Sequence, residues 1–482
     1  MNKAKFTLFV LICFFYLNTS AQESKKDYSE AFKIIEVWLD AQKDYEKLPG
    51  ISAAIIKDQE IIWSGAFGKA NIEADVNTET TTICSICSIS KLFTATAIMK
   101  LYDEGKLRLD DKVSDLLPWY NLDQKYSESG PITVRTLLTH SSGLPREANF
   151  PYWTGPDFPF PSKEEIKKEL GNQETLYPAS TYFQYSNLGL TLLGEIVEQV
   201  AGVSFTEYVE EHIIKPLQLN DTRTQLPENL YGSQLAIGYS SLNREGQRKK
   251  VKLFQANGIT AAAGFSSNVL DLGKFASWQF RLLDSTITEI IKPSTLKYMQ
   301  QVHWTDPDWK TTWGLGFAVS KGSDETKWVS HGGSCPGYRS GIQLNPKSKM
   351  AYAVMINANG TNPHKYAMEM HAILNKVKEE SKNGKVIGTS KKDMTEYTGY
   401  YSNQPWGSES YISSWEGKLV LLRLPSQSPA KSMIFLKHVK GDSFQKIRKD
   451  EEPGEMIIFE RDETGKITKY SQHGNYSNKT RN

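Results

Sequence analysis

The first hundred residues alternate between helix-like and strand-like hydrophobic patterns. Apolar side chains recur at helical spacing over residues 29–46, which predicts an amphipathic helix. Two β-rich runs follow, residues 51–57 and 60–67, and the polar turn between them predicts an antiparallel hairpin. An apolar stretch over residues 88–104 predicts a second helix, and Gly105 suits its end.

The next part of the chain has helices first and strands afterwards. Helix-like patterns mixed with loops occupy residues 120–310, and a series of strands with one last helix follows. The predicted helices are residues 133–139, 188–200, 205–214 and 364–380, and the predicted strands are residues 313–319, 328–331, 337–344 and 350–356. Strands from both ends most simply join one sheet, so we expect an α+β fold: an antiparallel sheet flanked by helices, with an α-rich insertion lobe.

A change of pattern separates the last hundred residues from the rest. Residues 381–392 are polar, charged and glycine-containing, which predicts a linker between a domain of residues 22–380 and one of residues 393–482. Short β-like runs fill the second domain: residues 397–401, 417–424, 433–437, 444–447, 456–459 and 467–470. Their spacing predicts a small all-β barrel or sandwich.

The first 21 residues have the pattern of an export signal. Two lysines precede an apolar run, residues 6–17, that is too short for a membrane span. Thr19-Ser20-Ala21 then offers small residues at a cleavage site before Gln22. We therefore expect residues 1–21 to be a signal peptide and the mature protein to be exported, periplasmic or secreted, without a membrane span.

The net charge and the cysteine content limit which partners and cofactors the chain is expected to have. The 482-residue chain has 57 Lys and Arg against 55 Asp and Glu, so its charge does not indicate nucleic acid as a partner. Outside the signal segment lie Cys84, Cys87 and Cys335, an odd number that argues against a disulfide framework. The C-x-x-C spacing of the first two leaves zinc, a local disulfide or buried thiols open. We favour thiols, because no second pair completes a metal site, and we expect no metal or other cofactor.

Ser88-Ile89-Ser90-Lys91 places a hydroxyl and an amine on one face of the second predicted helix. A serine becomes nucleophilic when a nearby base takes its proton, and a lysine with a lowered pKa can be that base. The tetrapeptide alone occurs by chance in many chains, but two more motifs accompany it. Tyr185-Ser186-Asn187 precedes the helix of residues 188–200, and His331-Gly332-Gly333 ends a predicted strand.

Together the three motifs resemble those of the penicillin-recognising serine hydrolases. They are most similar to the class C β-lactamase-like branch, which includes D-Ala-D-Ala carboxypeptidases, D-aminopeptidases and esterases. Residues 132–145 (ITVRTLLTHSSGLP) and 262–267 (AAGFSS) also match that branch. The resemblance covers roughly residues 30–380 and implies a β-lactamase/transpeptidase-like fold. It also implies an acyl-enzyme on Ser88, with an oxyanion hole made of the backbone N–H groups of Ser88 and Ser334.

The side-chain chemistry agrees with that resemblance. Ser88 begins a helix, whose dipole favours a developing alkoxide. Lys91 can accept or relay the serine proton if burial lowers its pKa. A neighbouring ammonium would stabilise the phenolate of Tyr185, which could then act as a base toward Ser88 and as an acid toward the leaving group. Asn187 offers both a donor and an acceptor, for Lys91 and for a substrate amide.

The third motif departs from the β-lactamases at its first residue. His331 stands where those enzymes usually have a lysine, whose fixed charge attracts the substrate carboxylate. Because histidine is mostly neutral at pH 7, the change favours peptidase or esterase activity over efficient β-lactam hydrolysis. Arg339 could supply the missing charge or could point to solvent, and Gly332 and Gly333 let the strand approach a substrate closely. His140 lies outside the motifs, and we expect it to be structural.

The sequence thus predicts an exported serine hydrolase acting on a peptide, with D-residues in the leading case, or on a small ester. β-Lactamase activity is the nearest alternative, and a non-catalytic binding or scaffold protein on this fold is another. The run 332–336 (GGSCP) nearly matches the nucleophile elbow G-x-S-x-G, but it ends in proline and lacks the β/α alternation of that fold. The pattern leaves the oligomeric state open. For the C-terminal domain, the resemblance suggests shaping of the cleft or assembly.

Overall fold

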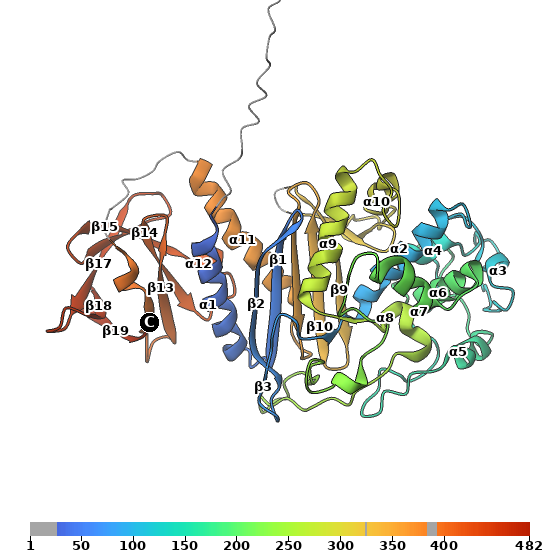
Figure 1. Cartoon of the computed structure of the whole chain (residues 1–482), viewed down its shortest axis with the longest axis horizontal. Coiled ribbons are helices and arrows are strands. Elements are labelled where there is room, and N and C mark those ends of the chain that lie inside the picture. Colours follow the sequence, from blue (N-terminus) through green and yellow to red (C-terminus); the bar gives the residue numbers. More distant parts are fainter. Residues whose placement is uncertain (1–26, 323–324, 383–392) are drawn as a thin grey trace, which may run out of the picture.

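The computed structural model describes residues 27–322, 325–382 and 393–482. The predicted signal peptide and all but the first two residues of the predicted linker therefore lie outside the described residues. Within them, a mixed helix-and-sheet body carries a helical lobe on one side and a β-barrel on the other (Figure 1).

The body is built on a nine-stranded sheet in the order β3-β2-β1-β11-β10-β9-β8-β7-β6, and its paired strands are antiparallel. The strands are β1 (Gly50–Lys57), β2 (Glu60–Asn71), β3 (Val76–Asn77), β6 (Trp304–Thr305), β7 (Thr312–Trp313), β8 (Ala318–Lys321), β9 (Lys327–Cys335), β10 (Tyr338–Asn345) and β11 (Met350–Ile356). Since β1 lies beside β11, strands from the two ends of the region do join one sheet, as the sequence predicted.

Alternating side chains of the central strands serve two separate cores. In β1, Ala54 and Ile56 belong to the core on the side of α2 (Ser90–Asp103) and α9 (Val269–Asp284). Ala53 and Ile55 belong to the core on the side of α1 (Ser29–Tyr45) and α11 (Pro363–Lys382). Successive strand residues point to opposite faces, so a strand covered on both sides is apolar throughout. This explains the unbroken apolar run of β1.

The helical lobe packs beside the sheet on the side of α2 and supplies two of the three motifs (Figure 1). Its remaining elements are β4 (Cys84–Ser85), η1 (Cys87–Ile89), α3 (Val113–Leu116), α4 (Val134–Leu138), α5 (Lys163–Leu170), α6 (Asn187–Ala201), α7 (Phe205–Val209), η2 (Glu210–Ile214), η3 (Glu228–Leu230), η4 (Asn257–Ile259), α8 (Thr260–Ala263), β5 (Ser266–Ser267) and α10 (Pro293–Met299). The helices predicted at residues 133–139 and 188–200 correspond to α4 and α6.

The C-terminal region is a closed eight-stranded barrel. Its elements are η5 (Thr395–Tyr397), β12 (Gly399–Ser402), β13 (Glu409–Trp415), β14 (Lys418–Leu424), α12 (Pro429–Ser432), β15 (Ile434–Lys440), β16 (Ser443–Ile447), β17 (Pro453–Arg461), β18 (Ile467–Gln472) and β19 (Asn475–Arg481). Of the barrel and the sandwich that the sequence left open, the structure shows the barrel.

The barrel packs against α1 and α11, on the sheet face opposite α2. Trp415 and Leu422 of the barrel share a core with Trp38 of α1, and the Trp38 indole N–H donates to the Ser426 carbonyl at 2.9 Å. The barrel and the helical lobe therefore lie on opposite sides of the sheet.

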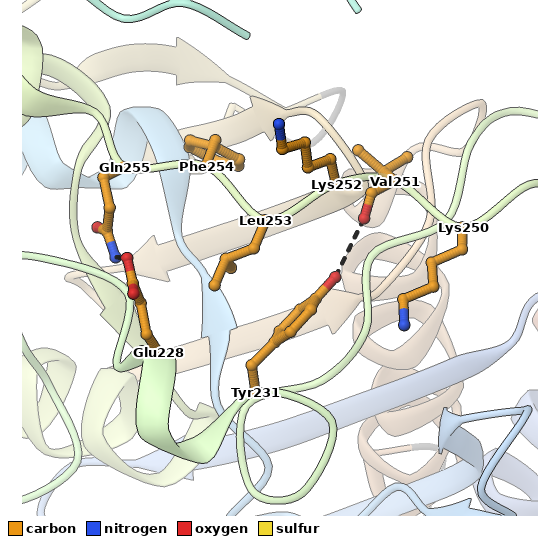
Figure 2. A pocket seen from close by; sticks show the side chains of 8 residues that line it. All are labelled: Glu228, Tyr231, Lys250, Val251, Lys252, Leu253, Phe254 and Gln255. Carbon is orange, nitrogen blue, oxygen red and sulfur yellow. Dashed lines mark hydrogen bonds between the residues drawn. The ribbon is translucent and has the colours of Figure 1, made fainter. Parts of the chain in front are cut away.

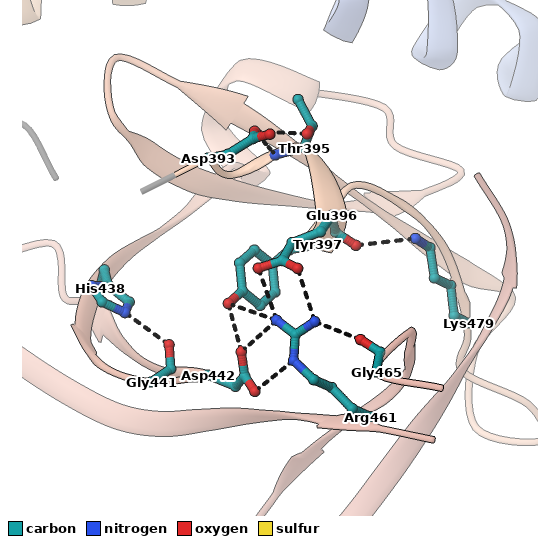
Figure 3. A network of polar contacts seen from close by, with 10 residues as sticks. All are labelled: Asp393, Thr395, Glu396, Tyr397, His438, Gly441, Asp442, Arg461, Gly465 and Lys479. Carbon is teal, nitrogen blue, oxygen red and sulfur yellow. Dashed lines mark hydrogen bonds and ion pairs between the residues drawn. The ribbon is translucent and has the colours of Figure 1, made fainter. Parts of the chain in front are cut away.

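A charged network ties the start of the barrel to its later strands (Figure 3). The guanidinium of Arg461 on β17 pairs with Glu396 of η5 and with Asp442 of the β15–β16 turn, both at 2.8 Å, and it donates to the Gly465 carbonyl at 2.7 Å. Tyr397 donates from its hydroxyl to Asp442 at 2.6 Å. These bonds hold η5, the segment that enters the barrel, against the β17–β18 hairpin.

One strand prediction was wrong, and two strands of the barrel were missed. Residues 313–319 form two strands instead of one, because the chain turns between β7 and β8: Gly316 has φ +85°, and the Gly314 N–H donates to the Phe317 carbonyl at 2.8 Å. The barrel also contains β13 and β19, which the sequence did not predict.

Among the described residues, no single helix combines the length and apolar composition of a membrane span. The pair Asn187–Ala201 and Phe205–Ile214 meets those criteria only when joined, and it is bent by 82°.

Candidate active site

Ser88 lies in the short turn η1, directly ahead of α2. The preceding residue, Cys87, has φ +53°, a left-handed conformation that is strained for a residue with a Cβ and is typical of functional turns. Ser90 Oγ holds the turn, donating to the Cys87 carbonyl at 2.5 Å and accepting from the Phe265 N–H at 3.0 Å. The Ser88 side chain is partly exposed, so a substrate can reach it.

Lys91 is fully buried one helical turn beyond Ser88. Its Nζ donates to Asn187 Oδ1 at 2.7 Å, to the Ala262 carbonyl at 2.8 Å and to Ser88 Oγ at 3.3 Å. Burial lowers the pKa of Lys91 from 10.5 to about 7, chiefly because the charged form loses its hydration. An amine that is partly neutral at pH 7 and bonded to the serine can accept the serine proton.

Tyr185 lies beside this pair, just ahead of α6. Its ring centroid is 4.9 Å from Lys91 Nζ, which lies over the ring. Burial raises the pKa of Tyr185, and the hydrogen bond with Ser88 offsets only part of that shift. The structure therefore favours a neutral phenol with Lys91 as the proton acceptor, in contrast to the phenolate base that the sequence suggested.

The segment of residues 132–145 positions the second motif. The Ser186 N–H donates to Nδ1 of His140 at 3.1 Å, and Ser186 Oγ donates to the Pro145 carbonyl at 2.7 Å. The His140 ring centroid lies 4.2 Å from that of Tyr185. Burial and the positive charge of Lys91 lower the pKa of His140 well below 6.5, so the ring is neutral. His140, which lies outside the three motifs, thus contacts the tyrosine of the second motif directly.

His331 is buried on β9 at the edge of the site, with its ring centroid 6.3 Å from that of Tyr185. Its Nδ1–H donates to the Gly332 carbonyl at 2.8 Å, which leaves Nε2 as the bare acceptor nitrogen. Nε2 is buried and has no partner among the described residues. Burial, together with the charge of Lys91, lowers the pKa of His331 to about 3, so it adds no positive charge at neutral pH.

The two glycines of the third motif face opposite sides of the sheet. A Cβ on Gly333 would lie 2.3 Å from the Ile86 carbonyl of the segment that carries Ser88, so only glycine allows β9 this close to η1. A Cβ on Gly332 would meet nothing nearer than 3.8 Å. β8 pairs with β9 only as far as Ser330, so residues 331–335 have a free edge on that side among the described residues.

Arg339 does not join the site. It lies opposite Ser334 in the β9–β10 register, and opposed residues share a face of the sheet. Their neighbours Gly333 and Ser340 face η1, where Ser340 Oγ donates to the Ile86 carbonyl at 2.9 Å. Alternation therefore directs the side chains of Ser334 and Arg339 to the opposite face. Because its side chain points away from the site, Ser334 can contribute only its backbone N–H to the oxyanion hole, beside the N–H of Ser88.

The cysteines among the described residues, Cys84, Cys87 and Cys335, are free thiols, and all are buried. Cys87 and Cys335 lie in contact below the site, and burial raises the pKa of the Cys87 thiol. Of the alternatives that the sequence left open, buried thiols are what the structure contains.

Sequence reasoning missed one charged pair at the site, Arg146 and Glu147. Asn187 Nδ2 donates to both carboxylate oxygens of Glu147, at 2.8 and 2.9 Å, and Arg146 Nε lies 3.1 Å from the same carboxylate. The Arg146 guanidinium lies 4.9 Å from the Tyr185 ring centroid. Their position in the chain could have indicated them, because the pair directly follows the segment of residues 132–145. That segment contacts Ser186 of the second motif.

Figure 2 shows a cavity of about 590 Å³ in another part of the chain. It is lined by Glu228, Tyr231, Lys250, Val251, Lys252, Leu253, Phe254 and Gln255. The Tyr231 hydroxyl donates to the Val251 carbonyl across it at 3.0 Å. It contains no residue of the three motifs, so chemistry, and not cavity size, identifies the site around Ser88.

Comparison with known proteins agrees with the three motifs and with the fold. The family model described as Beta-lactamase matches residues 38–374, which include all three motifs. The chain belongs to the Beta-lactamase family. Its architecture, an antiparallel sheet with a helical lobe, is the β-lactamase/transpeptidase-like fold of the serine hydrolases in this superfamily.

Two curated relatives set the range of similarity. Protein flp of Staphylococcus aureus (strain MW2) is 28% identical over 329 residues, which are 66% of this chain and 61% of that protein. Beta-lactamase-like protein 2 of Dictyostelium discoideum is 32% identical over 235 residues, which are 45% of this chain and 42% of that protein. The matches thus span 42–61% of the length of these relatives.

Solved structures extend the similarity to the barrel. The octameric penicillin-binding protein homologue from Pyrococcus abyssi has a TM-score of 0.64 and 27% identity, and the match covers 92% of this chain and 99% of that one. A D-stereospecific amidohydrolase from Streptomyces sp. has a TM-score of 0.57 and 24% identity, covering 71% of this chain and 98% of that one. At 24% identity the second comparison shows the fold alone.

Proposed function

We propose that this protein is an exported serine hydrolase that forms an acyl-enzyme on Ser88, with a peptide or a small ester as substrate. The buried amine of Lys91 carries the proposal, because it bonds to Ser88 Oγ and has a pKa near neutrality. A lysine with only a structural role would not require a hydrogen bond between its amine and the hydroxyl of a nucleophilic serine.

In the proposed reaction, Ser88 Oγ bonds to the substrate carbonyl carbon while Lys91 Nζ takes the serine proton. The N–H groups of Ser88 and Ser334 receive the negative charge that develops on the carbonyl oxygen. The intermediate then collapses, and Tyr185 donates its proton to the departing amine or alcohol and is reprotonated by Lys91. Water next attacks the acyl carbon, loses a proton to the same pair, and releases the acid and the free serine.

The state of His331 favours peptides and esters over β-lactams. Its Nε2 is buried and has no hydrogen-bond partner among the described residues, and the neutral ring offers no positive charge to a substrate. A carboxylate in the same place would meet a lone pair and no fixed charge, and β-lactams carry such a carboxylate. We propose peptides, with D-residues as the leading case, and small esters as substrates ahead of β-lactams.

Covalent labelling tests this proposal directly. We expect a fluorophosphonate or a penicillin to form one adduct, which peptide mass spectrometry places on Ser88. Ser88→Ala removes the adduct, whereas Ser334→Ala, the control for a nucleophile elbow, keeps it. Turnover is then measured on D-aminoacyl amides, peptidoglycan fragments, short-chain esters and nitrocefin. The absence of an adduct with every acylating probe indicates a scaffold protein, and nitrocefin hydrolysis near the diffusion limit indicates a β-lactamase.

Export gives a separate prediction. When the full chain is produced in a bacterial host with a secretion pathway, we expect mature protein outside the cytoplasm that begins at Gln22. Intact-mass analysis of the purified protein reads the N-terminus. Protein that stays in the cytoplasm and keeps Met1 contradicts this proposal and leaves the chemistry of Ser88 unaffected.

A further inference from the structure

Glu147 occupies a place in the site that none of the three motifs assigns. Its carboxylate receives both contacts from Asn187 Nδ2, at 2.8 and 2.9 Å, and Arg146 Nε at 3.1 Å. Tyr152, from a segment rich in aromatic residues, donates its hydroxyl to Glu147 Oε2. Burial and the carboxylate raise the pKa of Tyr152, so the phenol keeps the proton that it donates. A carboxylate with this many donors is held in one position.

The carboxylate determines which way the Asn187 amide points. An ionised carboxylate only accepts hydrogen bonds, so the NH₂ group of Asn187 must face Glu147. The amide oxygen then faces the amine of Lys91, to which it lies at 2.7 Å. A flipped amide would turn its NH₂ group against the three N–H donors of a charged lysine. The chain Tyr152–Glu147–Asn187–Lys91 thus fixes an acceptor beside the amine.

We propose that Glu147 is a positioning residue of the acyl-transfer site: it orients Asn187, and its negative charge sets how readily Lys91 takes up the serine proton. This inference rests on the proposed function of Ser88 and Lys91. It explains why a loop outside the motifs places a carboxylate next to the only side-chain amide among the motif residues.

The charged and titratable groups around Lys91 allow the direction of the effect to be worked out. Those on the neighbouring elements are the thiols Cys87 and Cys335, the neutral rings of His140, Tyr185 and His331, and the pair Arg146 and Glu147. Desolvation lowers the pKa of Lys91, Glu147 opposes that shift most strongly, and Arg146 adds to it. Removing the negative charge of Glu147 must therefore lower the pKa of Lys91 further. Lys91 then remains neutral, and able to act as a base, at lower pH than in the wild type.

The test is the pH dependence of fluorophosphonate labelling of Ser88 in the full-length protein, followed by intact mass. In Glu147→Gln we expect the acidic limb to move down by about one pH unit, since a nearby opposite charge shifts a pKa by about 1–3 units. At pH values below the wild-type acidic limb, the variant then labels Ser88 faster than the wild type does. Its maximum labelling rate, reached on the plateau at higher pH, is lower than that of the wild type. An unchanged limb in folded Glu147→Gln overturns the role of its charge, because a merely structural residue would lower the rate at every pH alike.

Three further variants separate charge from contact. Glu147→Asp keeps the negative charge but moves the carboxylate away from Asn187. We therefore expect the acidic limb to stay at the wild-type pH and the plateau labelling rate to be about tenfold lower. This variant still tests the inference if Glu147→Gln does not fold, and a wild-type plateau contradicts the positioning role. Tyr152→Phe keeps the carboxylate and should leave the limb in place. Glu73→Gln, which also removes a carboxylate bonded to a tyrosine hydroxyl, at 2.7 Å in the turn after β2, should match the wild type.

Failure of the inference is distinguishable from failure of the proposed function. If Ser88 takes no label in the wild type, the proposed acyl transfer is wrong. If Ser88 is labelled and the limb does not respond to Glu147→Gln, acyl transfer stands and only the role of Glu147 is wrong.

Discussion

Replacing Lys91 by methionine is expected to lower the rate of Ser88 acylation by about 10³-fold, within the range that general bases contribute. Methionine fills much of the lysine volume, but it has no group to receive the serine proton. It also cannot donate to Asn187 Oδ1 or to the Ala262 carbonyl, which accept from Lys91 at 2.7 and 2.8 Å. Labelling kinetics with a fluorophosphonate measure the loss without knowledge of the natural substrate.

The same substitution should change how the stability of the protein depends on pH. The pKa of Lys91 is about 7 in the folded protein, against an ordinary value of 10.5. Between these values the unfolded chain carries a proton at Lys91 that the folded chain lacks. Raising the pH therefore stabilises the folded state, and below pH 7 this gain is absent. From pH 6 to pH 9 the free energy of unfolding should rise by about 2–3 kcal/mol more in the wild type than in Lys91→Met.

A lysine on the same helix provides the control. Lys100 lies near the end of α2, where its partly buried side chain pairs with Glu104 at 2.7 Å. Lys100→Met should keep the acylation rate and the pH-dependent stability of the wild type. Denaturant unfolding at several pH values measures the difference between the two variants. Equal slopes for Lys91→Met and the wild type contradict a buried, partly neutral amine.

Much of the fold follows from local pattern, and the misses have a physical cause. β11 spans Met350–Ile356, as predicted, because both of its faces are buried and its residues are apolar throughout. β19, in contrast, is almost entirely polar and forms because β12 and β18 offer it hydrogen-bonding edges that close the barrel. No local hydrophobic pattern encodes a strand that is stabilised by barrel closure. In β13, serines at buried positions hide the strand in the same way.

The site shows the same division between local and tertiary information. The spacing of Ser88 and Lys91 on one helical face is local, and the structure places their side-chain atoms 3.3 Å apart. Glu147 reaches Asn187 across 40 residues of chain, so no periodicity reveals it. The protonation states of Tyr185 and Lys91 depend on burial, which a motif does not specify. This is why the sequence suggested a phenolate where the structure favours a neutral phenol beside a partly neutral amine.

Replacing Gly333 by alanine is expected to reduce the acylation rate by 10²- to 10³-fold, the effect of about 2.7–4 kcal/mol for one lost oxyanion donor. The added Cβ would lie 2.1 Å from Ser340 Oγ and 2.3 Å from the Ile86 carbonyl. Those two atoms share a hydrogen bond at 2.9 Å, so neither yields freely. The methyl group must therefore push β9 away from η1. In the proposed site these segments carry the N–H groups of Ser334 and Ser88, so their separation opens the oxyanion hole.

Gly332→Ala is the matched comparison, because it adds the same methyl group one residue earlier on the same strand. Its Cβ would meet nothing nearer than the Ser340 carbonyl at 3.8 Å, so we expect the wild-type melting temperature. Gly333→Ala should lose about 1–3 kcal/mol of stability by overpacking, together with the acylation rate per folded molecule. Thermal unfolding and labelling kinetics on both variants separate the two effects. A Gly333→Ala protein that melts lower yet labels Ser88 at the wild-type rate shows that the contact between β9 and η1 supports the fold without forming the oxyanion hole.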